Sequence, residues 1–153
     1  SLPGSALIPA VYGERLRSSF MAGRSIVDMV HKGITARKII TKESIRNAIK
    51  VTMAICGSTN AVLHLSAVAN EAELGMDVVR EFEKLNKTTP QIAKVNPAAK
   101  WDMEDFYRAG GIPRVMQRLG DIIDTSLITC TGKTIKENLS EYKFAYPENP
   151  EII

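Results

Sequence analysis

Residues 41–73 read TKESIRNAIKVTMAICGSTNAVLHLSAVANEAE, and this stretch decides the fold class. Thr41 is a good helix N-cap, and Glu43 places a negative charge in the first turn, where the helix dipole favours it. We therefore predict a helix over residues 43–56. Its expected buried face consists of small or apolar residues at helical spacing: Ile45, Ala48, Ile49, Thr52 and Met53.

The turn Gly57-Ser58-Thr59-Asn60 interrupts this pattern, and Ser58 is placed to cap a second helix over residues 60–73. Apolar residues occur nearly all round that helix: Ala61, Val62, Leu63, Leu65, Ala67, Val68 and Ala69. A helix of this kind is normally buried on most sides. We expect it to be among the most buried segments, so that Leu63→Ala or Leu65→Ala costs about 2–5 kcal/mol.

The sequence before residue 41 predicts one long helix. Pro3, Gly4 and Pro9 favour an extended or turn conformation over residues 1–10. Residues 11–32 then carry an apolar stripe with spacings of four, three, four and three, which predicts a helix that Gly33 ends. The stripe consists of Leu16, Phe20, Gly23, Val27 and Val30.

After residue 73 the predicted helices are short. One covers residues 76–85 and ends before Pro90, and another begins near Met103 with Asp102 as its cap. Gly110, Gly111 and Pro113 are expected to break it before a further helical stretch over 114–119.

The C-terminal part contains the best strand candidate, Ser126–Cys130. Thr134 and Glu137 fit a capping box for a last short helix, and the Pro-rich tail from Lys143 reads as irregular. Strands and helices do not alternate over a length that makes a full sheet. The expected class is therefore mainly α with one or two short strands, as a fragment of an α/β domain.

The composition excludes several classes of protein. The chain has 153 residues, a net charge of +3 and no basic run, so we expect no nucleic-acid partner. It has no run of 18 apolar residues and no signal peptide, so we expect no membrane span. Its two cysteines form no C-x-x-C pair, and low cysteine usage is typical of a cytoplasmic protein.

Ser58, Thr59 and Asn60 are the residues we expect to lie near a substrate pocket. A helix N-terminus with free amides and hydroxyl side chains suits an anionic group such as a carboxylate. The alternative is plain helix capping with close packing at Gly57, which is the commoner use of such a turn. We expect no catalytic and no metal-binding residue in this chain.

Other polar groups have ordinary structural interpretations. Glu104 and Asp105 could form paired carboxylates beside the Gly110-Gly111 loop, but a negative first helical turn is the commoner use of such residues. His64 is expected to be a buried histidine with its hydrogen bonds satisfied rather than a catalytic base. Cys56 and Cys130 are expected to be small core residues. The string Thr131-Gly132-Lys133-Thr134 lacks the first glycine of a phosphate-binding loop, since Leu127 stands there.

Several strings, in order along the whole chain, resemble the dihydroxy-acid and sugar-acid dehydratase family, also called the IlvD/Edd family. The most specific is Gly57-Ser58-Thr59-Asn60-Ala61-Val62-Leu63-His64-Leu65, which is similar to the family's G-S-T-N-x-V-L-H-L string. The others are Leu2-Pro3-Gly4-Ser5-Ala6, Ala22-Gly23-Arg24-Ser25-Ile26-Val27, Met103-Glu104-Asp105-Phe106, Ala109-Gly110-Gly111-Ile112-Pro113 and Thr131-Gly132-Lys133-Thr134. Cys56 is a departure, because the family usually has glycine there.

The resemblance implies a hydro-lyase that converts a 2,3-dihydroxy acid into a 2-oxo acid, with branched-chain amino-acid synthesis as the first pathway and sugar-acid dehydration as the alternative. It implies an iron–sulfur cluster and Mg²⁺ in the full-length protein, held by segments outside residues 1–153, and a homo-oligomer. The chain then resembles the second part of the N-terminal domain, cut from a longer protein, and we expect no cofactor in it.

Two other classes of function are alternatives to an enzyme. A non-catalytic helical scaffold or interface module stays open. A DNA-binding helix–turn–helix formed by helices 43–56 and 60–73 fails on charge, because the second helix has no Lys or Arg to reach bases and phosphates.

Overall fold

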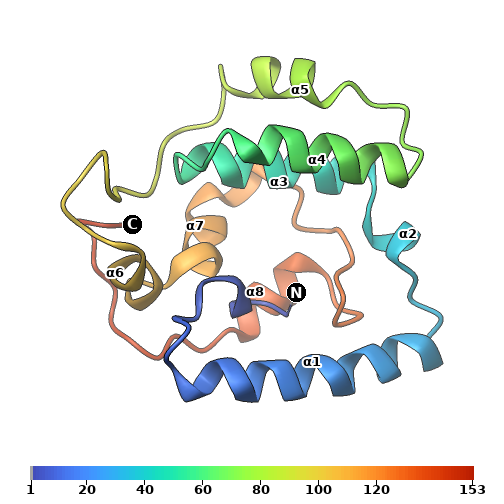
Figure 1. Cartoon of the computed structure of the whole chain (residues 1–153), viewed down its shortest axis with the longest axis horizontal. Coiled ribbons are helices and arrows are strands. Elements are labelled where there is room, and N and C mark those ends of the chain that lie inside the picture. The colour runs from blue at the N-terminus through green and yellow to red at the C-terminus, as the bar shows by residue number, and fades with distance from the viewer. Residues whose placement is uncertain (1) are drawn as a thin grey trace.

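The computed structural model describes residues 2–153, and helices dominate this range (Figure 1). It contains eight α-helices and two short 3-10 helices, joined by turns and irregular segments. The elements are η1 (Ser5–Leu7), α1 (Gly13–His31), α2 (Ala36–Ile39), α3 (Lys42–Ala54), α4 (Asn60–Glu71), α5 (Val78–Leu85), α6 (Met103–Arg108), α7 (Gly111–Leu119), η2 (Gly120–Ile122) and α8 (Ile135–Glu141).

Helices α3, α4 and α5 pack against one another and form one side of the molecule (Figure 1). Their contact is a small apolar cluster made of Ile45, Ile49, Ala69 and Val78, all of which are buried. Ile45 and Ile49 are one helical turn apart on α3, as the spacing in residues 43–56 predicts. The ion pair between Arg46 of α3 and Glu81 of α5, at 2.9 Å, ties the same helices together at the edge of the cluster.

A larger apolar cluster lies around α7, which contacts α3, α6, α8 and η1. Phe106 and Val115 are fully buried in it. The tail completes this cluster, because Ile152 and Ile153 are buried there and the Ile152 carbonyl accepts a hydrogen bond from the Lys94 backbone amide at 2.9 Å. The irregular tail is therefore part of the core.

Three of the predicted helix starts are confirmed by their side-chain contacts. Thr41 caps α3 and exchanges hydrogen bonds with Ser44, and Asp102 does the same with Asp105 at the start of α6. Thr134 and Glu137 form the expected capping box of α8. Each cap satisfies amides of the first turn, which have no partner inside the helix.

A buried polar contact joins α3 to the segment that follows η2. The Asn47 side chain is only 5% exposed, and its amide nitrogen donates to the Asp124 carbonyl oxygen at 2.8 Å. Its amide oxygen accepts from the Asp124 backbone N–H at 2.9 Å. One turn further along, the Lys50 ammonium donates to the Ile122 carbonyl oxygen at 2.6 Å. These contacts fix the chain after α7 against α3.

The predicted break between the two helices is confirmed at Ala109 and Gly110, but the start predicted at residue 114 is wrong, because α7 already begins at Gly111 and includes Pro113. Pro113 is the third residue of the helix, where a backbone N–H has no partner inside the helix, so the proline costs no hydrogen bond there. Gly110 supplies the left-handed conformation before the helix, with φ of 110°.

The mainly α class is confirmed, while the strand expected at Ser126–Cys130 is reduced to a single bridge. Ile128 pairs antiparallel with Thr134, and residues 2–153 contain no longer ladder. The Thr129 N–H donates to the Lys133 carbonyl at 2.9 Å, so residues 128–134 form a tight turn that leads into α8.

The prediction that helix 60–73 is among the most buried segments is wrong. Of α4 only Ala69 is buried, and the Leu63 side chain is 70% exposed. The physical reason is that α4 lies against α3 and α5 along one side, and Leu63 lies on the side turned away from that contact. Leu63→Ala is therefore not expected to cost 2–5 kcal/mol in this chain.

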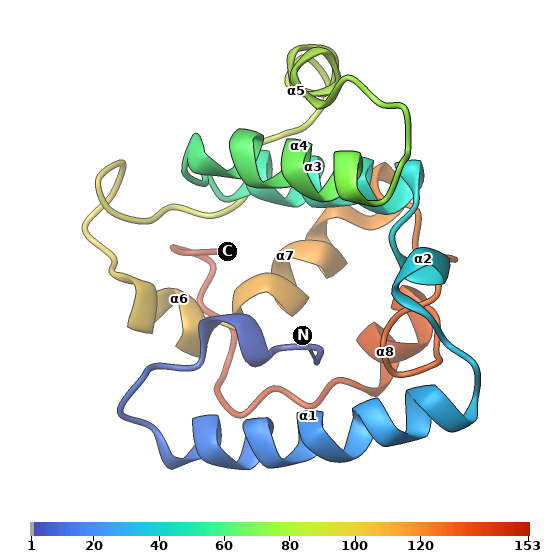
Figure 2. The same ribbon diagram turned by 45° about the vertical axis from the view of Figure 1, so that its right-hand side comes forward.

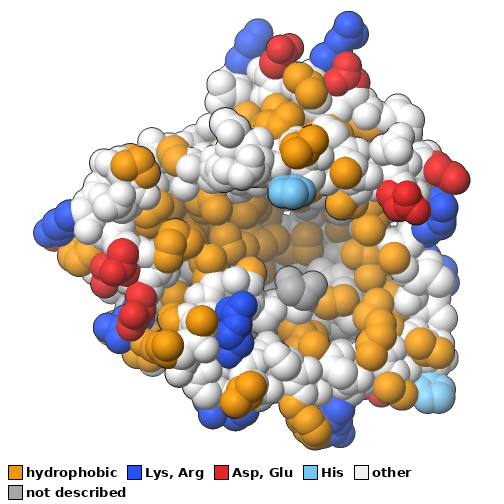
Figure 3. Space-filling view, viewed as in Figure 1, with side chains coloured by type: hydrophobic (Ala, Val, Ile, Leu, Met, Phe, Trp, Pro, Cys, Tyr) orange, Lys and Arg blue, Asp and Glu red, His pale blue; other side chains and the backbone are white. Residues whose placement is uncertain are grey.

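Helix α1 lies at the opposite edge of the molecule from α3, α4 and α5, as two views 45° apart show (Figures 1 and 2). The face seen in Figure 1 is hollowed at its centre, and hydrophobic side chains gather around the hollow (Figure 3). Among residues 2–153, no helix combines the length and apolar character that crossing a membrane requires.

Candidate functional site

The turn before α4 presents the three residues for which a substrate contact is expected. Ser58, Thr59 and Asn60 are all exposed. The Ser58 hydroxyl accepts a hydrogen bond from the Asn60 backbone N–H at 3.2 Å, so it partly fulfils the capping role. Thr59 is the N-cap residue, and its hydroxyl caps no amide. The turn therefore leaves the Thr59 hydroxyl open to solvent at a helix N-terminus, while the first backbone amides of α4 donate to Ser58 and Thr59.

The backbone before this turn is tightly wound. Cys56 has a φ of 51°, a conformation that glycine adopts more readily than cysteine. A side chain at Gly57 would stand 2.9 Å from the Thr52 methyl carbon and 3.1 Å from its carbonyl oxygen. Glycine at residue 57 thus allows the chain to reverse close to α3.

Two predictions next to this turn are wrong. Cys56 is exposed and is not a core residue, because α3 ends at Ala54 and the chain turns outward before the cysteine. His64 is exposed as well, and is not a buried histidine with satisfied hydrogen bonds, because it lies on the uncovered side of α4. Cys130, in the turn before α8, is half-buried.

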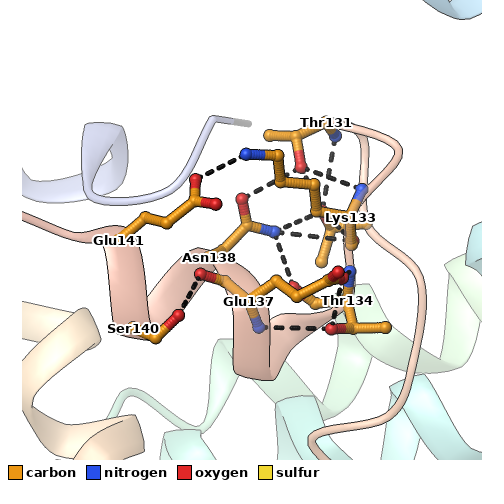
Figure 4. A network of polar contacts seen from close by, with 8 residues as sticks. Thr131, Lys133, Thr134, Glu137, Asn138, Ser140 and Glu141 are labelled. Carbon is orange, nitrogen blue, oxygen red and sulfur yellow. Dashed lines mark hydrogen bonds and ion pairs between the residues drawn. The ribbon is translucent and has the colours of Figure 1, made fainter.

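The string Thr131-Gly132-Lys133-Thr134, which resembles part of a phosphate-binding loop, is fixed by hydrogen bonds and an ion pair with α8 (Figure 4). The Thr131 hydroxyl donates to the Asn138 amide oxygen at 3.0 Å, and the Asn138 amide nitrogen donates to the Thr129 hydroxyl at 2.8 Å. The Lys133 ammonium is paired with Glu141. These contacts position α8. They agree with the sequence, which lacks the first glycine of a nucleotide-binding loop.

Glu104 and Asp105 also have structural partners. Asp105 belongs to the cap of α6, whereas Glu104 accepts hydrogen bonds from the Tyr12 hydroxyl at 2.7 Å and from Arg108 at 2.6 Å. This network attaches the start of α1 to α6, and no local sequence pattern predicts it, since Tyr12 and Glu104 are far apart along the chain. It leaves no pair of free carboxylates there.

A second contact strengthens this attachment. The Tyr107 hydroxyl of α6 donates to the Glu14 carboxylate of α1. Burial, and then the hydrogen bond to that carboxylate, raise the pKa of Tyr107 well above its ordinary value. The phenol therefore stays protonated as a donor throughout the physiological pH range.

Metal ligands do not gather anywhere in the part of the chain that the structure describes. No group of three or more His, Cys, Asp or Glu side chains lies close enough there to hold a metal ion. Cys56 follows α3 and Cys130 precedes α8, so the two thiols belong to different parts of the fold. These residues do not fit an iron–sulfur cluster, which usually takes three or four thiolates.

Curated relatives match the chain from end to end. A dihydroxy-acid dehydratase from Methanothrix thermoacetophila is 42% identical over all of this chain and 28% of its own length. Proteins with the same name from Nitratidesulfovibrio vulgaris and Carboxydothermus hydrogenoformans are 43% and 44% identical over all of the chain and 28% and 27% of their lengths. The chain thus spans little more than a quarter of these relatives.

The family comparison agrees with the relatives. The model described as "Dihydroxy-acid/6-phosphogluconate dehydratase N-terminal" matches residues 1–138, which is most of the chain. The motifs that carry the resemblance, from Leu2-Pro3-Gly4 to Thr131-Gly132-Lys133-Thr134, lie inside this range. The chain belongs to the dihydroxy-acid and 6-phosphogluconate dehydratase family.

Proposed function

We propose that this chain is part of a hydro-lyase that removes water from a 2,3-dihydroxy acid and yields a 2-oxo acid. In this reaction the C2 proton and the C3 hydroxyl leave as water, and the resulting enol becomes the ketone. The observation that carries the proposal is the match to proteins named dihydroxy-acid dehydratase along the whole chain, at 42–44% identity in three of them.

The proposed substrate is a branched 2,3-dihydroxy acid of branched-chain amino-acid synthesis. The second candidate is a sugar acid, because the family description also names 6-phosphogluconate. The two differ in charge and length, since a phosphorylated sugar acid carries a second anionic group that a short branched acid lacks. A site built for one is therefore expected to discriminate against the other.

The test is a direct comparison with the full-length protein that contains this chain, purified without oxygen. The 2-oxo acid formed from 2,3-dihydroxy-3-methylbutanoate or from 6-phosphogluconate is measured as its hydrazone. We expect a higher kcat/KM for the branched acid. A higher value for the phosphorylated acid would refute the proposed substrate, and turnover of neither would refute the hydro-lyase.

We further propose that Ser58, Thr59 and Asn60 lie beside the substrate pocket of the full-length protein. Support comes from their exposure and from the free Thr59 hydroxyl at the N-terminus of α4, where the helix dipole favours an anion. In the full-length enzyme, Thr59→Val should raise KM. The matched control is Thr88→Val in the exposed turn after α5, which should leave KM unchanged.

The iron–sulfur cluster and Mg²⁺ that the resemblance implies are proposed to bind outside residues 1–153. The described cysteines do not fit a cluster, so no step of the reaction is assigned to this chain through either group. Residues 1–153 are proposed to be the second part of the N-terminal domain of a cytoplasmic homo-oligomer, with a structural role. Within the enzyme, residues 1–153 thus act as a helical scaffold.

A further inference from the structure

Helix α1 turns its apolar stripe away from the rest of the chain. None of its 19 residues is buried. The exposed fractions are 78% for Leu16, 67% for Phe20 and 73% for Val30, and a side chain added at Gly23 would meet nothing within 4 Å. A row of large apolar side chains along one long helix, open to solvent, indicates a surface that another element covers.

The opposite face of α1 is the one that looks toward the rest of the chain. Glu14, Arg17, Ser18, Met21 and Ser25 of α1 line a cavity of about 570 Å³ on that side, with Arg17 at the edge toward the apolar stripe. The N-terminal segment and α8 line the other side of the same cavity. Apart from Met21, the side chains on the inward side are polar, and the apolar stripe points outward, the reverse of an amphipathic helix on its own core.

The chain itself holds α1 mainly near its two ends. At its start, Tyr12 and Glu14 bind Glu104 and Tyr107 of α6. After its end, Ile34 approaches the turn at Gly132, where an added Cβ would stand 3.0 Å from the Ile34 side chain. The stripe lies between these attachments and remains accessible along its length.

The spacing of the stripe specifies the kind of element that fits it. Intervals of four, three, four and three residues form the seam of a helix that packs lengthwise on another helix. Arg17 and Arg24 lie seven residues apart on one edge of this seam, and both are exposed without a hydrogen bond or ion pair in the described structure. A helix with acidic residues beside its own apolar seam complements this edge.

A second copy of α1 fits this edge poorly. Antiparallel pairing of two such helices brings the same edge of each together, and that edge carries Arg17 and Arg24 against the single carboxylate of Asp28, so that a net positive charge on each copy would face the other. The curated relatives, in contrast, extend over more than three times the length that this chain matches. A helix from that remaining length is joined covalently to α1 and is present at a high effective concentration.

We propose that the outward face of α1 is covered, in the full-length protein, by an amphipathic helix with acidic flanking residues from the part of the same polypeptide outside residues 1–153. This rests on the proposed place of the chain in a longer protein and is independent of the reaction. Arg17 and Arg24 pair with carboxylates of that helix, and Leu16, Phe20, Val27 and Val30 fill the seam.

Zero-length cross-linking of the full-length protein tests this. A carbodiimide joins amines to carboxylates that touch them, and arginine does not react, so Arg17→Lys with Arg24→Lys introduces amines at the edge of the seam. We expect new cross-links from positions 17 or 24 to Asp or Glu outside residues 1–153, in a band with the mass of one subunit on a denaturing gel. Arg80→Lys is the matched control, because its new amine should couple to Asp77, the partner of Arg80 at 3.3 Å.

Three results would overturn the proposal. The first is cross-links from positions 17 and 24 only in a band of doubled mass, which would assign the face to a second subunit. The second is coupling only to carboxylates within residues 1–153, and the third is no coupling while the control couples. As an independent measurement, Arg17→Glu with Arg24→Glu should lower the Tm of the full-length protein. An unchanged Tm would also overturn it.

Discussion

Replacing Asn47 by alanine removes the buried amide that joins α3 to Asp124. The native amide donates one hydrogen bond and accepts one, at 2.8 and 2.9 Å, to the backbone of a single residue. Alanine can make neither, and the backbone groups of Asp124 lose their side-chain partner. The segment after α7 then loses one of its two polar anchors on α3, leaving the contact from Lys50.

The magnitude follows from the two hydrogen bonds and from burial. Each hydrogen bond contributes about 1 kcal/mol net, and the truncated side chain leaves a small void in a site that is 5% exposed. We expect Asn47→Ala to lower the free energy of unfolding by about 2–4 kcal/mol. Asn70→Ala is the control, because Asn70 is exposed on α4 and should change it by less than about 0.5 kcal/mol.

Asn47→Asp tests the two hydrogen bonds of the Asn47 side chain separately, because it removes the amide donor and keeps an oxygen acceptor. It keeps the acceptor for the Asp124 N–H but places a carboxylate oxygen against the Asp124 carbonyl oxygen, which disfavours the charged form and raises the pKa of the new carboxyl. A group with a raised pKa in the folded state adds stability below its unfolded pKa and loses it as the pH rises. The free energy of unfolding of this variant should therefore fall further below that of the native chain as the pH rises from 4 to 7.

Urea unfolding of the 153-residue chain, followed by far-ultraviolet circular dichroism, measures all three variants at both pH values. The reasoning fails if Asn47→Ala is as stable as the native chain, or if Asn70→Ala loses as much. A deficit of Asn47→Asp that does not change with pH would show that the Asp124 carbonyl does not face the substituted side chain as described.

Three further outcomes follow from the fold. Phe106→Ala should cost about 3–5 kcal/mol in urea unfolding, because Phe106 is fully buried in the larger apolar cluster. The hydrogen bond from Arg46 lowers the pKa of Glu81, so the ion pair stabilises the fold above the usual carboxyl range and this stabilisation is lost as the pH falls. Glu81→Gln should therefore make the free energy of unfolding less dependent on pH at acidic pH. Thr134→Ala removes the cap of α8 and should lower stability by about 1 kcal/mol, read as a lower Tm.

The parts of the fold that depend on neighbours in sequence could be predicted. The caps at Thr41, Asp102 and Thr134 are confirmed because a cap needs only residues within one turn of each other. The buried positions Ile45 and Ile49 also follow from helical spacing. In the candidate site, the turn at Ser58 follows from the same local rules, while its contact with a substrate stays a prediction.

The parts that depend on a distant partner could not be predicted. The outward stripe of α1 and the exposed Leu63 of α4 look the same in sequence as residues of a buried face, because apolar periodicity shows which residues share a side and not what covers it. The burial of Ile152 and Ile153 in an irregular tail has no periodic signal at all. Cys56 is exposed because a turn in its backbone directs it outward, which depends on packing of the turn against Thr52.

The burial of Ile152 and Ile153 has a consequence for the order of events during synthesis. Their cluster also contains Ala54, Phe106 and Val115, so its members are separated by up to about a hundred residues. A ribosome delivers the chain from its N-terminus, and the last two side chains of this cluster emerge long after the first. Helices α3, α4 and α5 have their own smaller cluster and can assemble earlier, whereas the packing around α7 has to wait until residue 153 is free.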